Sequence, residues 1–206
     1  METMTAWNRN IPFFEHEIKP LVRGQDIKIL EIGSYQGAST RWMLDNLATH
    51  PQSEVWCIDV WEETPQHEGA DFQQVEALFD QQVAPHQSKV KKLKGDSWRQ
   101  LISLNNRPVL PEFDLIYIDG DHSAQGVIQD LILSWPLLLE GGIVVCDDYV
   151  WKENLEAWRL GFRDYGSPLE TPKMAIDAFT LIYSNKVRHW ISYYQYGTVA
   201  FMKISG

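Results

Sequence analysis

The chain has 206 residues, with 28 acidic against 18 basic side chains and a formal net charge of −10. This length favours one domain with a sizeable core, and 44% hydrophobic residues exclude a disordered chain. Nucleic acid is disfavoured as a partner, because neutralising phosphates requires a basic surface. The excess of carboxylates is compatible with a metal site.

Two further features indicate a cytoplasmic protein with no membrane partner. Cys57 and Cys146 lie in apolar, strand-like runs, which predicts buried, unpaired thiols in a reducing compartment, with a disulfide as the alternative. Residues 1–14 lack an apolar run of the signal-peptide type. No stretch approaches the roughly 18 apolar residues of a membrane-spanning helix.

From residue 27 onward, short apolar runs alternate with helical patterns. The runs predict strands at 28–32, 54–59, 90–95, 113–119 and 142–147, and the helical patterns lie near 39–48, 71–84, 97–104 and 123–138. Short, continuously apolar runs such as 115–118 and 143–145 indicate burial on both faces. Alternating strands and helices with such burial predict a parallel sheet covered on both sides.

The pattern changes after Tyr149. Helices are predicted over 151–163 and 173–183, and strands over 187–194 and 198–204 are expected to pair as an antiparallel hairpin. The predicted fold is therefore α/β, a doubly wound, Rossmann-like seven-stranded sheet that is mostly parallel and ends in an antiparallel hairpin.

Two parts of the chain are expected from this pattern. Residues 1–26 form an N-terminal helical or irregular extension, in which Pro12 and Pro20 are expected to break helices. Residues 27–206 form a single domain.

Residues 31–39 (EIGSYQGAS) predict a glycine-bearing turn between a strand and a helix. Glycines let the backbone approach a nucleotide, and the helix N-terminus supplies free N–H donors. Gly33 and Gly37 are four residues apart, unlike the Gly-x-Gly-x-x-Gly of dinucleotide binders, which disfavours NAD or FAD. Tyr35 and Ser39 can hydrogen-bond a ligand, or serve as a packed turn aromatic and a helix N-cap.

Two acids follow the ends of the next predicted strands. Asp59 is placed to accept hydrogen bonds from vicinal ribose hydroxyls, with a cap or turn acid as the alternative. Asp96 can accept from an exocyclic adenine amine, or act as a simple N-cap. Trp61, just beyond Asp59, is a candidate for stacking on adenine. These positions predict a nucleoside-containing cofactor.

Three further acids follow the fourth and fifth strands. Asp119 ends one strand, and Asp147 and Asp148 end the other. Neighbouring parallel strands lie about 4.8 Å apart, so these acids converge if the two strands are neighbours. Carboxylates so close repel one another unless they are protonated or bridged by a cation, and Mg²⁺ prefers oxygen ligands. The alternative is that one acid is a cap and another pairs with Arg or Lys.

His122 is the candidate general base of this region. An imidazole with its ordinary pKa near ~6.5 suits proton abstraction at neutral pH. Asp119 competes for this role, and a histidine that caps the following helix is the structural alternative.

These motifs together resemble class I S-adenosylmethionine-dependent methyltransferases over roughly residues 27–204. Residues 31–39 are similar to the cofactor loop of catechol-type O-methyltransferases. Residues 118–122 with 145–149 resemble the subgroup that includes metal-dependent sugar O-methyltransferases of antibiotic tailoring. Catechol-type enzymes have asparagine where Asp148 stands and a catalytic lysine where His122 falls.

The resemblance implies a role for each matching residue. Gly33, Tyr35 and Ser39 would contact the methionine part of S-adenosyl-L-methionine, and Asp59 would hold its ribose. The implied ligands of Mg²⁺ or another divalent cation are Asp119, Asp147 and Asp148. The full set expected at the cofactor is Glu31, Gly33, Ser34, Tyr35, Gly37, Ser39, Asp59, Val60, Trp61, Gly95, Asp96, Ser97, Asp119 and His122.

The predicted function is methyl transfer from S-adenosyl-L-methionine to an oxygen of a small hydroxylated molecule, assisted by a divalent metal, with His122 and Asp119 as catalytic residues. Two alternatives stay open: a metal-independent small-molecule methyltransferase, and a non-catalytic S-adenosylmethionine-binding protein. The acceptor cannot be read from the sequence, and homo-oligomerisation is also left open.

Overall fold

The computed structural model describes residues 6–22, 25–62, 71–110, 112–149, 171–190 and 197–205. A helical N-terminal segment consists of η1 (Ala6–Asn10), α1 (Ile11–Phe13), η2 (Phe14–Ile18) and α2 (Lys19–Val22). The strands are β1 (Lys28–Ile32), β2 (Glu54–Asp59), β3 (Val90–Lys94), β4 (Phe113–Ile118), β5 (Leu138–Cys146), β6 (Val187–Trp190) and β7 (Val199–Lys203). The remaining helices are α3 (Ala38–Asn46), α4 (Phe72–Val83), η4 (Ala84–Lys89), α5 (Ser97–Asn105), α6 (Ala124–Ser134), η5 (Trp135–Leu137) and α8 (Pro172–Ile182).

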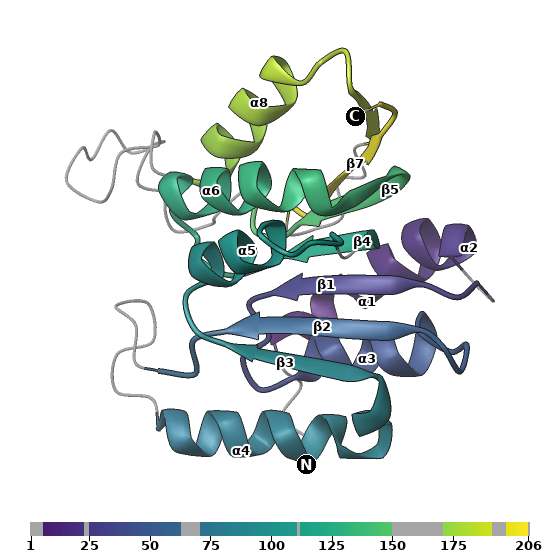
Figure 1. The fold of residues 1–206 in the computed structure, drawn as a ribbon, viewed down its shortest axis with the longest axis vertical. Helices are drawn as coiled ribbons and strands as arrows, with labels where there is room; N and C mark the ends of the chain where they lie inside the picture. The colour runs from purple at the N-terminus through teal and green to yellow at the C-terminus, as the bar shows by residue number, and fades with distance from the viewer. Residues whose placement is uncertain are drawn as a thin grey trace.

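The seven strands form one sheet in the order β3-β2-β1-β4-β5-β7-β6 (Figure 1). Strands β1 to β5 pair in parallel, and β7 pairs antiparallel with both β5 and β6. The predicted fold class is therefore confirmed. Strand β5 begins four residues before the predicted 142, and the helix predicted over 151–163 and the hairpin residues 191–194 lie outside the described residues.

The sheet separates two hydrophobic cores, because alternate strand residues point to opposite faces. Ile29 and Leu115 belong to the core that packs against α3, α4 and the N-terminal segment. Leu30 and Ile116 belong to the core that packs against α5, α6 and α8. Both cysteines are buried and free, as predicted. No helix among the described residues combines the length and apolarity that a membrane span requires.

The N-terminal segment contributes directly to the first of these cores. Phe13, Phe14 and Ile18 are fully buried there. Pro12 and Pro20 do not end the helical segment as expected. Pro12 lies in the first turn of α1, where its missing N–H is not needed, and Pro20 follows a π-helical turn rather than interrupting a regular α-helix.

The parallel register brings the strand ends to one edge of the sheet. Ile32 pairs with Ile58 on one side and with Ile118 on the other. Ile118 in turn pairs with Cys146. The residues that follow these partners in the sequence therefore emerge side by side at the same edge.

Candidate functional site

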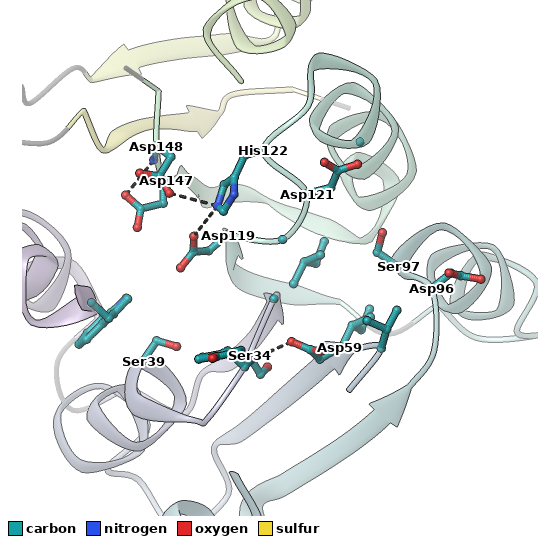
Figure 2. Close-up of a pocket in the computed structure, with 18 of the residues that line it drawn as sticks. Ser34, Ser39, Asp59, Asp96, Ser97, Asp119, Asp121, His122, Asp147 and Asp148 are labelled. Atoms are coloured by element: carbon teal, nitrogen blue, oxygen red, sulfur yellow. Dashed lines mark hydrogen bonds and ion pairs between the residues drawn. The ribbon is translucent and has the colours of Figure 1, made fainter. Parts of the chain in front are cut away.

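A cavity of about 1020 Å³ opens at this edge of the sheet, between the loops that follow β1 to β5 and the N-terminal segment. Most of the sequence-predicted site residues line it, namely Gly33, Ser34, Tyr35, Ser39, Asp59, Val60, Gly95, Asp96, Ser97, Asp119, His122, Asp147 and Asp148. Figure 2 shows two groups of side chains across this cavity. One group, which we call the cofactor side because the sequence predicts cofactor contacts for it, carries Ser34, Asp59 and Asp96. The acidic cluster, by which we mean Asp119, Asp147 and Asp148, lies opposite with His122 beside it.

Gly33 begins the turn on the cofactor side with φ +90°. Its N–H donates to the Ile58 carbonyl at 2.9 Å, which extends the ladder between β1 and β2 by one step. A Cβ added at Gly33 would lie 2.0 Å from the carbonyl oxygen of Asp119. Glycine is therefore required here by the close approach of the neighbouring loop as well as by the positive φ.

Glu31 is fully buried beneath this turn. Its carboxyl group accepts hydrogen bonds from Ser34 at 2.7 Å, from Ser39 and from Thr40. Burial raises the pKa of Glu31, and these hydroxyl donors only partly oppose that rise. The two predicted cofactor serines thus line the cavity while their hydroxyl groups bind Glu31. Gly37 also lies behind the lining, where it caps α3 with φ +83°.

Asp59 organises the backbone on the cofactor side. Its Oδ2 accepts from the Tyr35 amide and its Oδ1 from the Trp61 amide, both at 2.8 Å. Tyr35 and Trp61 each adopt φ +44°, a conformation that few non-glycine residues adopt. Asp59 therefore has the turn role that the sequence left as its alternative, while its carboxylate still faces the cavity.

Trp61 does not occupy the stacking position that the sequence suggested. The side chain is 2% exposed, its ring packs on Phe79, and its Nε1 donates to the Tyr35 carbonyl at 2.8 Å. Of the described residues, the indole that lines the cavity near the predicted adenine position is Trp98, which is 41% exposed. The Trp61 ring packs in the core and is held there by the hydrogen bond to Tyr35.

Asp96 lies at the far end of the cavity from the acidic cluster (Figure 2). It precedes α5, yet its side chain makes no capping hydrogen bond and instead pairs with Arg99 at 3.0 Å. Gly95 adopts φ +135°, and its N–H donates to the Asp59 carbonyl. Asp96 and Ser97 both line the cavity, and the Asp96 carboxylate does not cap the N-terminus of α5.

On the acidic side, the hydroxyl group of Tyr117 joins Asp119 and Asp147. Its oxygen lies 3.0 Å from Oδ2 of Asp119 and 2.9 Å from Oδ2 of Asp147, and it accepts a hydrogen bond from Trp7. The Asp119 and Asp147 carboxylates therefore converge, as predicted if β4 and β5 were neighbours. Tyr117, Asp119 and Asp147 face the N-terminal segment because alternate strand residues share a face.

Asp147 is the most enclosed of the three acids. Besides Tyr117, its carboxylate accepts from Asn10, from Thr198 at 3.0 Å and from the amide of Asp148 at 2.9 Å. Burial and the charge of Asp148 raise the pKa of Asp147. Its oxygens are thus engaged by four donors from different parts of the chain.

Asp148 turns back toward the cavity with φ +52° and pairs with two basic side chains. Its Oδ1 lies 2.7 Å from an Nη of Arg9, and its Oδ2 lies 3.1 Å from Nε2 of His122. The same His122 nitrogen lies 3.6 Å from Oδ1 of Asp119 (Figure 2). The pairing of one acid with arginine, which the sequence left as an alternative, is present.

Burial and neighbouring charges shift the pKa values of this group. Burial, reinforced by the charge of Asp147, raises the pKa of Asp119 to about 7. Burial alone would lower the pKa of His122, but hydrogen bonds to Asp119 and Asp148 outweigh it and raise that pKa to about 10. In this arrangement the imidazole is protonated at neutral pH, so it is not the neutral base that an ordinary pKa predicted.

The donor chemistry of this group fits a divalent cation. An oxygen of Asp119, an oxygen of Asp148 and a ring nitrogen of His122 all lie within 4.8 Å of one another. Two carboxylates and an imidazole are ligand types that divalent cations accept, provided that His122 gives up its proton when the cation binds. The third candidate ligand is therefore His122 and not, as the sequence predicted, Asp147. The Asp147 oxygens already accept hydrogen bonds from within the protein.

Sequence reasoning missed the residues that hold the acidic cluster from outside, chiefly Trp7, Arg9, Asn10 and Thr198. Tyr117 carried a usable signal, since it lies two residues before Asp119 on a strand and so shares its face. The others carried none, because nothing in the order of residues ties the N-terminus to the end of β5.

Solved structures with a similar fold include methyltransferases. The O-methyltransferase TomG from Streptomyces achromogenes, solved with SAM, matches 91% of this chain and 78% of its own at 19% identity, with a TM-score of 0.64. An O-methyltransferase from Bacillus cereus, solved with SAH, matches 90% and 78% at 21% identity, with a TM-score of 0.61. The mycinamycin-pathway methyltransferase MycE, solved with Mg and SAH, matches 94% and 49% at 18% identity, with a TM-score of 0.60. The fold of this chain is similar to that of these methyltransferases.

A family model described as a methyltransferase domain matches residues 30–149, more than half of the chain. The chain belongs to this methyltransferase family, which confirms the family predicted from the sequence. The uncharacterized protein R132 of Acanthamoeba polyphaga mimivirus is 29% identical over 130 residues, which are 60% of this chain. The chain matches about half the length of that relative.

Proposed function

We propose that the protein transfers a methyl group from S-adenosyl-L-methionine to an oxygen of a small hydroxylated acceptor. The observation that carries this proposal is that the cofactor side and the acidic cluster line the same cavity and face each other across it. Two reactants bound in one site gain a proximity advantage that reaches roughly 7–11 kcal/mol of the barrier. Family membership supports the chemistry, and the site residues supply the assignment of roles.

The cofactor side binds the nucleoside. Asp59 accepts from the ribose hydroxyls with the lone pairs that the Tyr35 and Trp61 amides leave available. Asp96 and Ser97 receive the adenine end of the cofactor. The turn that starts at Gly33 holds the methionine part, since β1 lies between β2, which ends at Asp59, and β4, which Asp119 follows.

The acidic cluster binds the acceptor and handles its proton. A divalent cation held by Asp119 and Asp148, with His122 beside them, supplies Lewis-acid activation of the acceptor hydroxyl when bound. When no cation is bound, Asp119 is suited to hold a proton at neutral pH, because its raised pKa lies near 7. His122 lies 3.6 Å from Asp119 and forms the second member of the proton-holding pair.

A metal-independent methyltransferase is the second candidate, and two contacts favour it. Arg9 and His122 already neutralise part of the acidic cluster from within the chain. In that case Asp119 and His122 act on the acceptor hydroxyl directly, and the proposed cofactor side is unchanged.

The first test is calorimetric titration of the protein with S-adenosylhomocysteine. We expect saturable binding that weakens in Asp59→Asn, and no binding at millimolar concentration would end the proposal. The second test measures transfer of a labelled methyl group to a panel of small phenols, catechols and sugars, with and without a chelator. Loss of transfer in chelator supports the metal-assisted reaction, and full activity in chelator supports the metal-independent one.

A further inference from the structure

Arg9 is held at the edge of the acidic cluster by the residues on either side of it. Trp7 Nε1 donates to the Tyr117 hydroxyl at 2.9 Å, and the Asn10 side chain donates to Asp147. Trp7 is 9% exposed and Asn10 only 2%. Because both anchors are buried, the backbone at Arg9 has a fixed position beside the cavity.

From this position the Arg9 guanidinium contacts Asp148 at 2.7 Å, with 31% of the arginine side chain and 9% of the aspartate side chain exposed. Burial opposes the guanidinium charge, but Asp148, Asp147 and Asp119 together raise the pKa of Arg9. Arg9 is thus a permanent cation in the field of all three acids.

The contact between Arg9 and Asp148 lies where a divalent cation would bind. Asp148 belongs to the trio whose ligand atoms lie within 4.8 Å of one another. A cation bonded to its Oδ1 has to displace the guanidinium, and one bonded to Oδ2 comes close enough to be repelled by it. The Oδ2 atom already faces His122 at 3.1 Å. In either position, Arg9 opposes the binding of a second cation.

We propose that Arg9 is a tethered counter-ion, which holds Asp148 when no divalent cation is bound and releases it when one binds. The inference rests on the proposed function, in which the acidic cluster takes a divalent cation. The anchors at Trp7 and Asn10 stay in place, so the released guanidinium remains beside the cavity. The affinity of the site for metal is therefore set by competition with a side chain of the same protein.

Arg9→Met tests this competition, because it removes the charge and keeps an unbranched aliphatic stem. Calorimetric titration with MnCl₂ at constant ionic strength, checked by the electron paramagnetic resonance of free Mn²⁺, measures the Kd. We expect the Kd to fall about tenfold or more, within the usual range for two coupled ligands. Arg41→Met is the matched control: it changes the net charge equally and breaks a 2.6 Å pair with Asp45 on α3. Its Kd should equal that of the wild type.

Several outcomes overturn the proposal. They are an unchanged or higher Kd in Arg9→Met, an equal gain in Arg41→Met, and no Mn²⁺ binding to either the wild type or Arg9→Met. Binding seen only in Arg9→Met would support it most strongly. S-adenosylhomocysteine titrations run in parallel distinguish failure of this proposal from failure of the proposed function. If the wild type does not bind S-adenosylhomocysteine, the methyltransferase proposal fails. The Mn²⁺ comparison then still tests the role of Arg9.

A measurement on the wild type covers the case in which Arg9→Met does not fold. Phenylglyoxal modifies accessible guanidinium groups, and peptide mass mapping gives the rate at each arginine. Saturating Mn²⁺ should speed modification of Arg9 and leave Arg41 unchanged. An unchanged or slower rate at Arg9 contradicts the release of Asp148.

Discussion

The two sides of the cavity are built in different ways. On the cofactor side, the hydrogen bonds run to the backbone of the turns: Asp59 accepts from the amide of Trp61, two residues away, and from that of Tyr35, 24 residues away. In the acidic cluster, side chains meet side chains over long separations, such as Asn10 and Asp147, which are 137 residues apart. The cofactor side therefore depends on local turn geometry, whereas the acidic cluster depends on correct packing of the whole domain.

This difference predicts which substitutions each side of the cavity tolerates. A turn fixed by glycine and amides fails when the backbone can no longer adopt its conformation. In a cluster of side chains, a substitution removes individual hydrogen bonds. Each removed bond lowers the free energy of unfolding by a modest amount unless a charge is left unpaired. The cofactor side should thus respond sharply to single backbone changes, and the acidic cluster more gradually.

Gly33→Ala should have the largest effect. The new Cβ would overlap the Asp119 carbonyl oxygen at 2.0 Å in a backbone that already has φ +90°. We expect a loss of about 3–5 kcal/mol in the free energy of unfolding and no measurable binding of S-adenosylhomocysteine. Gly141→Ala is the control, since Gly141 has φ +80° with nothing within 4 Å. If both variants lose the same stability by urea unfolding, the close approach at Gly33 is unimportant.

Asp59→Asn should come next, with a roughly 30-fold weaker affinity for S-adenosylhomocysteine. The amide replaces a charged acceptor by a neutral one in hydrogen bonds worth about 1.5–3 kcal/mol each. Asp114→Asn is the matched control, because Asp114 likewise accepts from a backbone amide, that of Lys28 at 2.8 Å. Asp114 lies at the start of β4, and the cavity is at the opposite end of that strand. Equal affinities for Asp59→Asn and the wild type, measured by calorimetry, would remove Asp59 from the cofactor site.

The charge on His122 predicts how stability depends on pH. Its pKa is about 10 in the folded protein against an ordinary 6.5, so the stabilisation from its proton is complete below pH 6.5 and is lost as the pH rises toward 10. In chelator, the free energy of unfolding of the wild type should fall by about 2 kcal/mol between about pH 6 and pH 8, and that of His122→Gln should fall by little. His50, which lies outside the cavity lining, supplies the control, and His50→Gln should follow the wild type. Parallel unfolding curves for all three proteins would contradict a paired His122.

Trp7→Phe should have the smallest effect and sharpen the contrast between the two sides. It removes the 2.9 Å hydrogen bond to the buried Tyr117 hydroxyl and keeps an aromatic ring, at a cost of about 1 kcal/mol. Affinity for S-adenosylhomocysteine should stay unchanged. Trp56→Phe removes a comparable bond to Glu54, two residues away on the same strand, and should cost less. A large loss of cofactor affinity in Trp7→Phe would show that the two sides are not independent.

Most of the fold and the cofactor side followed from the sequence alone. Strand, turn and helix patterns are local, so the bounds of β1 and β2 and the glycine-bearing turn after β1 were predicted closely. The carboxyl ends of parallel strands share an edge, which was enough to bring Asp59, Asp96, Asp119 and Asp147 to one cavity. Periodicity and topology carry such information because each depends on neighbours in the chain or in the sheet.

Only the tertiary structure decided how each acid is paired. Trp61 turned into the core, His122 became protonated between Asp119 and Asp148, and Arg9 reached Asp148 from 139 residues away. These outcomes depend on which side chains the packing brings within a few ångströms, and the strength of a charge pair depends on that distance and on burial. No pattern of residue types along the chain encodes that separation.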